Sequence, residues 1–566
     1  MVTPEARPFK TTGGLADVAG ALPHALARMG HRVTLVMPRY RGVDVADASS
    51  QSANVPFGPN LYPVTFHVGT PESRAATPEA RGATRAAKVT TAASGGSTTR
   101  SRVASAPVKA ATRVSAAAKA PARASKSAPA GSVTHVFIDA PDLFDRDGLY
   151  GDAAGEYTDN AFRFAVLSRG ALEYARLTGD RPSVIHAHDW QSGLVPLYLR
   201  TVLADDPVLG GVPSVFTIHN VAFQGLFSPD VLRWIDISPD LYGANGLEFY
   251  GRASLLKAGT LFSDKVTTVS PTYARELLSP GYAFAFDFEG ILASRAADFS
   301  GILNGIDTDA WDPARDRYVP EPFNAGSPAA KIEAKRALLK VAGLPSDSTA
   351  LKRPTIGLLS RLTYQKGFDL LSAAADSLMK LDATWVLLGD GDRHYEEFWT
   401  SLAQKHPDRV ATRLGFDEHL AHLIHAGSDL FLMPSRYEPC GLNQMYAMRY
   451  GTLPVVRATG GLEDTVQDAD EAAKEATGFR FRDFTADALV GALQRALDAF
   501  GDSRRWKSLQ RNAMKQDHSW DVSAREYVKV YRGTAEPRGR HGFRKSTDAD
   551  RRELRTDDQR RKSRTR

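Results

Sequence analysis

The chain contains 566 residues, including 71 Lys and Arg, 65 Asp and Glu, 43% apolar residues and one cysteine. This length predicts several domains and excludes a peptide hormone or a lone binding module. Cys440 cannot form an intramolecular disulfide, and no Cys/His spacing typical of zinc sites occurs, which excludes a disulfide-stapled or zinc-stabilised scaffold. No apolar run reaches the roughly 18 residues of a membrane span, and the N-terminus lacks a signal peptide's apolar stretch. We therefore expect a cytoplasmic protein that makes no membrane contact.

The net charge of +6 is distributed unevenly along the chain. Residues 72–131 hold eleven basic and two acidic side chains and no aromatic ring, and residues 536–566 hold twelve basic and six acidic ones. Such compositions bury too little apolar surface to fold, so we expect both segments to be disordered. The remaining residues then carry a net charge of about −9. Because the insertion offers no ring for base stacking, its charge favours a solvated spacer over a nucleic-acid tether.

The first half alternates apolar strands with amphipathic helices, the pattern of parallel sheets covered by helices. Apolar residues recur every three or four positions over 15–29 and predict a helix, which Pro23 should either kink or destabilise. A second helix is predicted over 160–177. The predicted strands are 32–37, 133–138, 183–187, 214–218 and 265–269.

The second half repeats this pattern from residue 354. Helices are predicted over 367–380 and 420–426, and strands over 355–360, 384–389, 410–414, 430–433 and 453–457. The Pro-rich, polar stretch between the halves predicts a linker. We therefore predict an α/β fold with two doubly wound domains, whose ligands bind in the crevice between them at the carboxyl ends of the strands. The expected boundaries are 1–310, interrupted by the insertion, a linker over 311–353, a domain over 354–535 and a tail over 536–566.

Strand ends in the second half carry charged and glycine-rich loops. Arg361 and Lys366 follow one strand, and two cations there suit a diphosphate, although a solvated helix start would show the same pattern. Glu438 follows another strand, and Gly441 then opens a helix. A carboxylate there can hold a sugar while the helix amides face phosphate. These loops, with two further Gly-rich turns, span 360–367, 389–392, 434–444 and 460–465.

The first half supplies polar groups for the facing wall of the crevice. Gly13 and Gly14 precede a helix and can bind an anion or a sugar, although a Gly-Gly turn before a helix often has only a structural role. His186 and His188 alternate on a strand, but no third ligand is near in sequence, which favours buried, hydrogen-bonded histidines over a metal site. Polar loops at 217–220 and 304–307 complete this wall. The sequence contains no P-loop, Gly-x-Ser-x-Gly or Gly-x-Gly-x-x-Gly motif. This disfavours a P-loop NTPase, an α/β-hydrolase and a classical dinucleotide-binding protein.

In this order the motifs resemble those of the bacterial glycogen synthase and plant starch synthase family. The resemblance covers about residues 2–531 apart from the basic insertion. It implies two Rossmann-like domains of the GT-B type that face a central cleft. It also implies transfer of glucose from ADP-glucose to the non-reducing 4-hydroxyl of an α-1,4-glucan such as glycogen, with retention of configuration and without a metal or other cofactor. The matching motifs are 13–18, 157–160, 186–190, 217–220, 224–225, 251–259, 269–274, 302–307, 360–367, 435–444, 460–466 and 519–520.

The resemblance also implies roles for individual residues. Arg361 and Lys366 would neutralise the leaving diphosphate, Glu438 would hold the donor glucose, and Cys440 would lie beside the sugar without acting as a nucleophile. His188 would contact the glucosyl group and Asp159 would position the acceptor or the sugar. The remaining implied substrate contacts are Lys10, Gly13, Gly14, Asp17, Asn304, Gln365, Gly441 and Leu442. A front-face mechanism, in which the leaving phosphate helps to deprotonate the acceptor, and a double displacement both stay open.

Two departures from the family pattern define an alternative. Thr11 occupies the position where the family carries a phosphate-binding lysine, and Lys10 precedes it. A lost charge-assisted contact of this kind costs about 1.5 to 3 kcal/mol. Only residues 1–4 represent the first central strand, which predicts a misplaced start or a fragment. The alternative is therefore a catalytically weakened, glucan-binding relative of the family.

Overall fold

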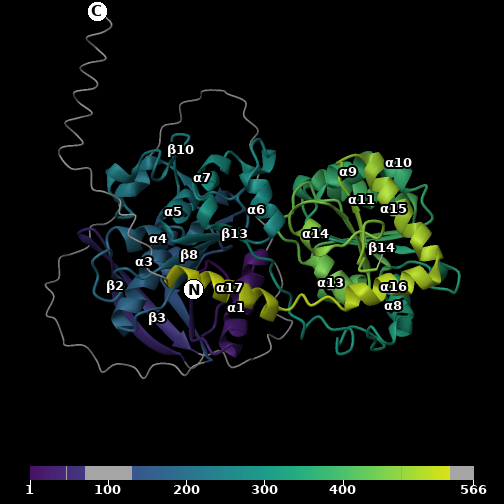
Figure 1. Cartoon of the computed structure of the whole chain (residues 1–566), viewed down its shortest axis with the longest axis horizontal. Coiled ribbons are helices and arrows are strands. Elements are labelled where there is room, and N and C mark those ends of the chain that lie inside the picture. The colour runs from purple at the N-terminus through teal and green to yellow at the C-terminus, as the bar shows by residue number, and fades with distance from the viewer. Residues whose placement is uncertain (46–47, 70–130, 473, 536–566) are drawn as a thin grey trace, which may run out of the picture.

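The computed structural model describes residues 1–45, 48–69, 131–472 and 474–535. Residues 72–130 of the basic insertion and the whole tail, both predicted to be disordered, lie outside the described residues. Two α/β halves lie side by side, joined by chain segments at the lower centre of the view (Figure 1). In the described part of the chain, no helix is both long and apolar enough to cross a membrane.

The first half is built on two four-stranded sheets joined by Val2. One sheet has the order β1-β4-β3-β2 and the other β13-β12-β8-β7. Val2 makes parallel bridges to Val36 and to Ala187, so it connects the two sheets. The strands are β1 (Val33–Pro38), β2 (Ser49–Phe57), β3 (Asn60–Gly69), β4 (Val133–Asp139), β7 (Ile185–His188), β8 (Ser214–Ile218), β12 (Lys265–Thr268) and β13 (Phe299–Gly301).

Helices and short pairings complete the first half. Pro23 lies inside the first helix, which runs without interruption. The helices are α1 (Gly14–Arg28), α2 (Pro141–Phe144), α3 (Asn160–Thr178), α4 (Leu194–Arg200), α5 (Leu255–Phe262), α6 (Pro271–Leu278) and α7 (Glu289–Ala293). The short strands are β5 (Gly151–Asp152), β6 (Gly155–Glu156), β9 (Leu226–Phe227), β10 (Glu248–Phe249) and β11 (Arg252–Ser254).

The antiparallel hairpin β2–β3 was not predicted. The first half of β2 is polar and exposed, and only its last residues, including Val55 and Phe57, are buried. An edge strand of this kind lacks the continuous apolar run by which a buried parallel strand is recognised. The five strands that were predicted in this half occur close to their expected positions.

The second half contains one six-stranded parallel sheet with the order β16-β15-β14-β17-β18-β19. The predicted helix over 367–380 is interrupted at Ala374, which separates α9 from α10. The strands are β14 (Thr355–Leu359), β15 (Thr384–Gly389), β16 (Val410–Leu414), β17 (Leu430–Met433), β18 (Leu453–Arg457) and β19 (Phe479–Phe481). The helices are α8 (Lys331–Val341), α9 (Phe368–Ala373), α10 (Ala375–Leu378), α11 (Arg393–Lys405), α12 (Glu418–Gly427), α13 (Asn443–Arg449), α14 (Gly460–Thr465), α15 (Ala486–Gly501) and α16 (Ser503–Met514).

The last helix, α17 (Trp520–Ala535), returns to the first half and lies beside α1 (Figure 1). Arg28 of α1 forms an ion pair with Asp521 at 2.6 Å, and the buried Trp520 and Tyr527 belong to the same apolar cluster as Val18. The sequence division had grouped this helix with residues 354–535. That division stays a prediction, but the contacts of α17 are with the first half.

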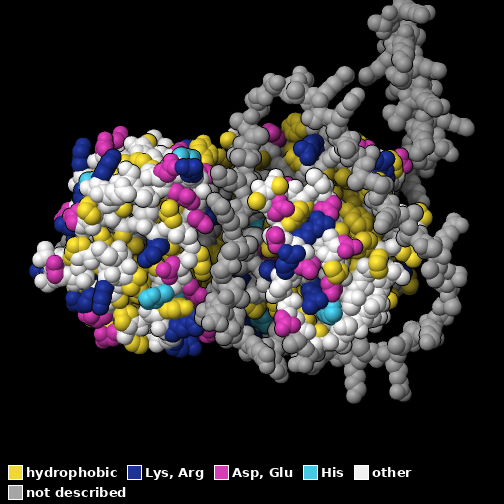
Figure 2. Space-filling model, turned by 180° about the vertical axis from the view of Figure 1, so that it is seen from behind, with side chains coloured by type: hydrophobic (Ala, Val, Ile, Leu, Met, Phe, Trp, Pro, Cys, Tyr) yellow, Lys and Arg dark blue, Asp and Glu magenta, His cyan; other side chains and the backbone are white. Residues whose placement is uncertain are grey.

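Basic and acidic side chains are interspersed on the face of the second half that Figure 2 shows. That face carries no broad surface of a single sign. On this face, therefore, the net negative charge of the folded part is not gathered into one acidic patch.

Lys331 should make the stability of the second half depend on pH. Its ammonium donates to the Ala426 carbonyl and to the Thr452 hydroxyl, both at 2.6 Å. Burial lowers the pKa of Lys331 to about 7. Between pH 7 and 10 the unfolded chain therefore binds more protons, and the stability should rise with pH by up to about 1.4 kcal/mol per unit.

Urea unfolding at pH 7, 8 and 9 measures this slope. Lys331→Met should lose it, whereas Lys340→Met, at an exposed position of the same helix, should keep the slope of the parent protein. Equal slopes in the parent and in Lys331→Met would contradict the expectation.

Candidate active site

A buried ion pair lies at the carboxyl ends of two adjacent strands. Lys366 follows β14, Glu438 follows β17, and these two strands pair in parallel. Lys366 Nζ lies 2.6 Å from Glu438 Oε2, and the Ser435 hydroxyl donates to the same oxygen at 3.0 Å. The Glu438 side chain is 6% exposed and that of Lys366 is 19% exposed. The structure therefore brings together two residues that lie 72 positions apart and were predicted to be catalytic.

Three glycines allow neighbouring backbone segments to pack closely against the Glu438 loop. A Cβ on Gly367 would lie 2.0 Å from the Pro434 carbonyl oxygen, and one on Gly460 would lie 2.0 Å from that of Glu438. A Cβ on Gly461 would lie 2.1 Å from the Cys440 carbonyl oxygen. Real Cβ atoms cannot approach so closely, so these turns must be glycine for the backbone segments to meet.

Gly460→Ala should displace the Glu438 loop. Gly460 has φ +45°, and its missing Cβ faces backbone rather than a movable side chain. We expect a loss of transferase activity of about 100-fold or more, because an Å-scale misplacement of a catalytic group costs about that much. Activity assays and thermal unfolding measure this effect. The control is Gly491→Ala in α15, where the new Cβ meets open space and should stabilise the helix by about 0.5 to 1 kcal/mol.

Other predicted contacts of the second half adjoin this pair. Arg361 is exposed and makes no ion pair within the described chain, so its guanidinium is available to a ligand. The Gln365 carbonyl accepts from the Arg436 N–H at 2.9 Å, which ties the Lys366 loop to the Glu438 loop. Gly441 has φ +71° and precedes Leu442, the N-cap of α13. Among the described residues, no group of three potential metal ligands gathers.

Buried polar atoms in the first half lack partners. His188 Nδ1 lies 3.1 Å from His219 Nε2, but His188 Nε2 is buried without a partner in the described structure. Burial lowers the pKa of His188 well below its usual value, so the ring is neutral at physiological pH. Asn304 Oδ1 is also buried and unpartnered. Because such atoms cost free energy unless they are hydrogen-bonded, both suit contacts with sugar hydroxyls.

His186 supports His188 rather than a metal ion. Its Nε2 lies 2.6 Å from the Thr217 hydroxyl and its Nδ1 lies 2.8 Å from the Tyr531 hydroxyl of α17. Both ring nitrogens therefore have protein partners, which agrees with the predicted hydrogen-bonded histidine. The residue after His188, Asp189, has φ +56° and accepts from the His219 N–H at 2.7 Å, so it ties the ends of β7 and β8 together.

The two halves meet directly around this site. The Glu276 carboxylate on α6 accepts from the Gly460 N–H at 3.0 Å, and Asp464 accepts from the Thr272 N–H at 2.8 Å. Burial raises the pKa of Cys440 to about 12, and an N–H from Asn304 of the other half opposes this shift more weakly. Cys440 is thus a neutral thiol, in line with a residue that lines the sugar site without attacking the sugar.

The turn before α1 carries several predicted substrate contacts. Gly13 and Gly14 are exposed, and a Cβ on either would meet open space. Asp17 forms an ion pair with Arg7 at 2.5 Å, and burial raises its pKa. Lys10 instead extends toward Gly42 in the loop after β1. Thr11, at the family's lysine position, is exposed.

Asp159 lies outside this set of contacts. Its two carboxylate oxygens accept from the Arg146 guanidinium at 2.8 and 2.7 Å, and Arg146 also stacks over Tyr157. A positioning role for Asp159 therefore stays a prediction.

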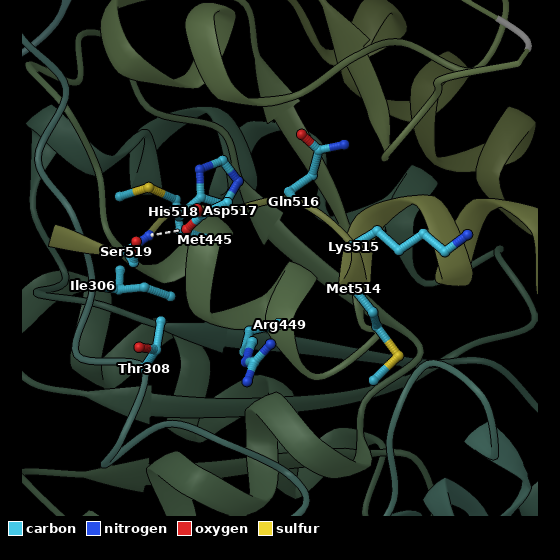
Figure 3. Close-up of a pocket in the computed structure, with 10 residues that line it drawn as sticks. All are labelled: Ile306, Thr308, Met445, Arg449, Met514, Lys515, Gln516, Asp517, His518 and Ser519. Atoms are coloured by element: carbon cyan, nitrogen blue, oxygen red, sulfur yellow. Dashed lines mark hydrogen bonds between the residues drawn. The ribbon is translucent and has the colours of Figure 1, made fainter. Parts of the chain in front are cut away.

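A cavity of about 250 Å³ lies where the chain crosses between the halves (Figure 3). None of the predicted site residues lines it. Its walls come from both crossing segments and from α13, and the dashed line marks the Ser519 N–H that donates to Asp517. The lining residues are Ile306, Thr308, Met445, Arg449, Met514, Lys515, Gln516, Asp517, His518 and Ser519.

Two aromatic residues of the second half were not singled out from the sequence. Tyr437 directly precedes Glu438 and is 7% exposed, and its hydroxyl interacts with the Asn220 side chain of the other half. Phe416 follows β16 and is 74% exposed. A large aromatic side chain directly after a parallel strand was the available signal for Phe416, because such strand ends border the ligand crevice.

Comparisons with known proteins agree with this geometry. Residues 1–79 and 74–294 match the family described as starch synthase catalytic domain, and residues 345–513 match glycosyl transferases group 1. The chain is 45% identical to a glycogen synthase of Anaeromyxobacter dehalogenans, over 94% of this chain and 99% of the relative. It is 40% identical to a glycogen synthase of Koribacter versatilis, over 93% and 96%.

A similar solved structure is the catalytic domain of starch synthase IV from Arabidopsis thaliana bound to ADP and acarbose. Its TM-score is 0.76 at 30% identity, over 94% of this chain and 98% of that chain. The two-half arrangement and the sheet order of this chain are therefore those of an α/β glycosyltransferase.

Proposed function

Because the chain belongs to the glycogen and starch synthase family, we propose that it transfers glucose from ADP-glucose to the non-reducing 4-hydroxyl of an α-1,4-glucan, with retention of configuration. The observation that carries this proposal is the buried Lys366–Glu438 pair at adjacent strand ends, beside the unpaired Arg361. The related starch synthase was solved with ADP and acarbose, which supports a nucleotide site and a glucan site in one cleft. A cytoplasmic location stays part of the proposal, on the strength of the single cysteine.

The residues divide the chemistry between two charges. As the bond to the sugar breaks, negative charge grows on the leaving diphosphate and positive charge grows at the anomeric carbon. Lys366 and Arg361 stabilise the first, and the Glu438 carboxylate stabilises the second. This division of charge explains why a cation and a carboxylate are held in direct contact: each neutralises the other until the donor arrives.

The opposite wall would hold the transferred sugar. His188 Nε2 and Asn304 Oδ1 are two of the buried polar atoms that lack a partner in the described part of the chain, and a glucosyl group offers several hydroxyls to them. We expect Gly13, Gly14 and Asp17 to add substrate contacts from the turn that opens α1, with Lys10 one residue before the usual lysine position. We expect Asp159 to position the acceptor or the sugar.

Purified protein incubated with glycogen and ADP-glucose or UDP-glucose tests the proposal. We expect nucleotide release and glycogen extension, faster with ADP-glucose. Release from neither donor would contradict a synthase. Glycogen co-sedimentation without turnover would favour the weakened relative with Thr11 at the lysine position.

Phe416 should contribute to binding of the nucleotide base. An exposed ring at a strand end of the sheet that carries Lys366 and Glu438 can stack on the adenine, and stacking of this kind is worth about 1 to 3 kcal/mol. Phe416→Ala should raise the KM for ADP-glucose by about 5- to 100-fold and change kcat little. The control is Leu61→Ala, which removes another exposed apolar side chain, 62% exposed, from the β2–β3 hairpin. An unchanged KM in Phe416→Ala would contradict base stacking.

A further inference from the structure

Two aromatic side chains of the first half pack against Tyr437, the residue that precedes Glu438. The Phe284 ring stacks on the Tyr437 ring with centroids 4.8 Å apart and an angle of 22°, and the Phe286 ring meets it edge-on at 5.8 Å. Tyr437 lies in the second half, 7% exposed. The catalytic loop of one half is thus held by rings from the other.

The segment that carries Phe284 and Phe286 has an unusual backbone conformation. Phe286 and Asp287 are consecutive residues with φ values of +52° and +63°, in the left-handed region that residues other than glycine rarely occupy. The Phe286 carbonyl accepts from the Gln224 side chain at 2.9 Å, which holds the turn. Such conformations persist only where the surroundings enforce them, and they gather at functional sites.

The same segment is tied to the second half at another point. Tyr282 donates from its hydroxyl to Glu276 at 3.1 Å, and the other Glu276 oxygen accepts from Thr459 and Gly460. Gly460 in turn packs against the Glu438 carbonyl. The segment 276–287 therefore contacts the Glu438 loop in two ways. Its aromatic rings pack on Tyr437, and Glu276 binds Gly460, which packs against the Glu438 backbone.

We propose that Phe284 and Phe286 form an aromatic clamp on Tyr437 that positions Glu438 when the two halves are together. Tyr437 is a positioning residue, because it acts on the substrate through Glu438. When the halves separate, Tyr437 loses both rings and the Asn220 contact, and the Glu438 loop is released. The clamp makes the geometry of the charge pair depend on contact between the halves, so that the site is complete only when donor and acceptor are enclosed. This inference rests on the transferase function proposed above.

The first test is kinetic. Phe284→Ala should lower kcat by about 10-fold or more and leave the KM for ADP-glucose within about 3-fold, because the donor contacts of the second half remain. Tyr437→Leu should resemble it, Tyr437→Phe should retain most of the activity, and the Phe284→Ala/Tyr437→Leu double variant should be no slower than the worse single variant. The control, Trp234→Ala, removes an exposed ring of the first half and should match the parent. Full kcat in Phe284→Ala, or independent effects that multiply in the double variant, would overturn the clamp.

The second test needs no substrate, so it separates a failed clamp from a failed function. Amide hydrogen exchange of residues 434–442 is measured in the parent protein, in Phe284→Ala and in Trp234→Ala. Loss of the clamp should accelerate exchange by about 5-fold or more in Phe284→Ala alone, while the thermal unfolding midpoints agree. Equal exchange in all three proteins would overturn the proposal even if none of them transferred glucose. If exchange differed between the proteins as expected but the parent transferred no glucose, the clamp would be supported and the proposed synthase function would be contradicted.

Discussion

Glu438→Gln should lower kcat by about 100- to 1000-fold, the range that follows loss of one preorganised electrostatic contact with a transition state. The substitution keeps the side chain's shape and one oxygen that can accept from Ser435, and it removes the charge while exchanging the other oxygen for an amide NH2. Because the donor is also bound through its diphosphate, the KM for ADP-glucose should change much less. Steady-state kinetics with saturating glycogen separate the two parameters.

The control for this variant is Glu397→Gln. Glu397 is 61% exposed and pairs with Arg393 on the surface of α11, where an ion pair contributes little. It should match the parent in kcat and stability. A Glu438→Gln enzyme with more than about a tenth of the parent's kcat would show that the carboxylate charge is not needed in the transition state.

The close approach of Lys366 to Glu438 follows from a pattern that the sequence already contains. Apolar, β-branched runs predict buried parallel strands, and the carboxyl ends of neighbouring parallel strands share one edge. Both residues lie in the loops that follow such runs, and the neighbouring order β14–β17 brings them into contact. Local sequence therefore predicted that these two residues lie close together, and their roles in donor binding stay a prediction.

The contacts between the halves had no comparable signal. Phe284 and Tyr437 are 153 positions apart and lie in loops without periodicity, and their stacking depends on how two separately folded bodies meet. The same holds for α17, whose amphipathic pattern shows that one face is buried but not that the partner is α1. The hairpin β2–β3 was missed for a different reason, since its exposed polar residues resemble a loop until β4 pairs with it.

Lys366→Met should abolish measurable transfer and also destabilise the second half, because the two roles of Lys366 are separable. The Glu438 side chain is only 6% exposed. Within the described chain, and in the absence of donor, the Lys366 ammonium is the only cation that contacts its carboxylate. Removing one member of a buried pair typically costs about 3 to 5 kcal/mol, since the other charge is left desolvated. Removing the cation also takes away stabilisation of the leaving diphosphate, for which we expect a further loss of about 1000-fold in kcat.

The double variant Lys366→Met/Glu438→Gln distinguishes these roles. With both charges gone, no unpaired ion remains buried, so most of the lost stability should return while the activity stays lost. Urea unfolding and ADP release from the parent, the two single variants and the double variant complete the cycle. If the double variant were as unstable as Lys366→Met, the cost would lie in packing around the lysine stem and not in the stranded Glu438 charge. If it regained activity, the charge pair would not be the centre of the reaction.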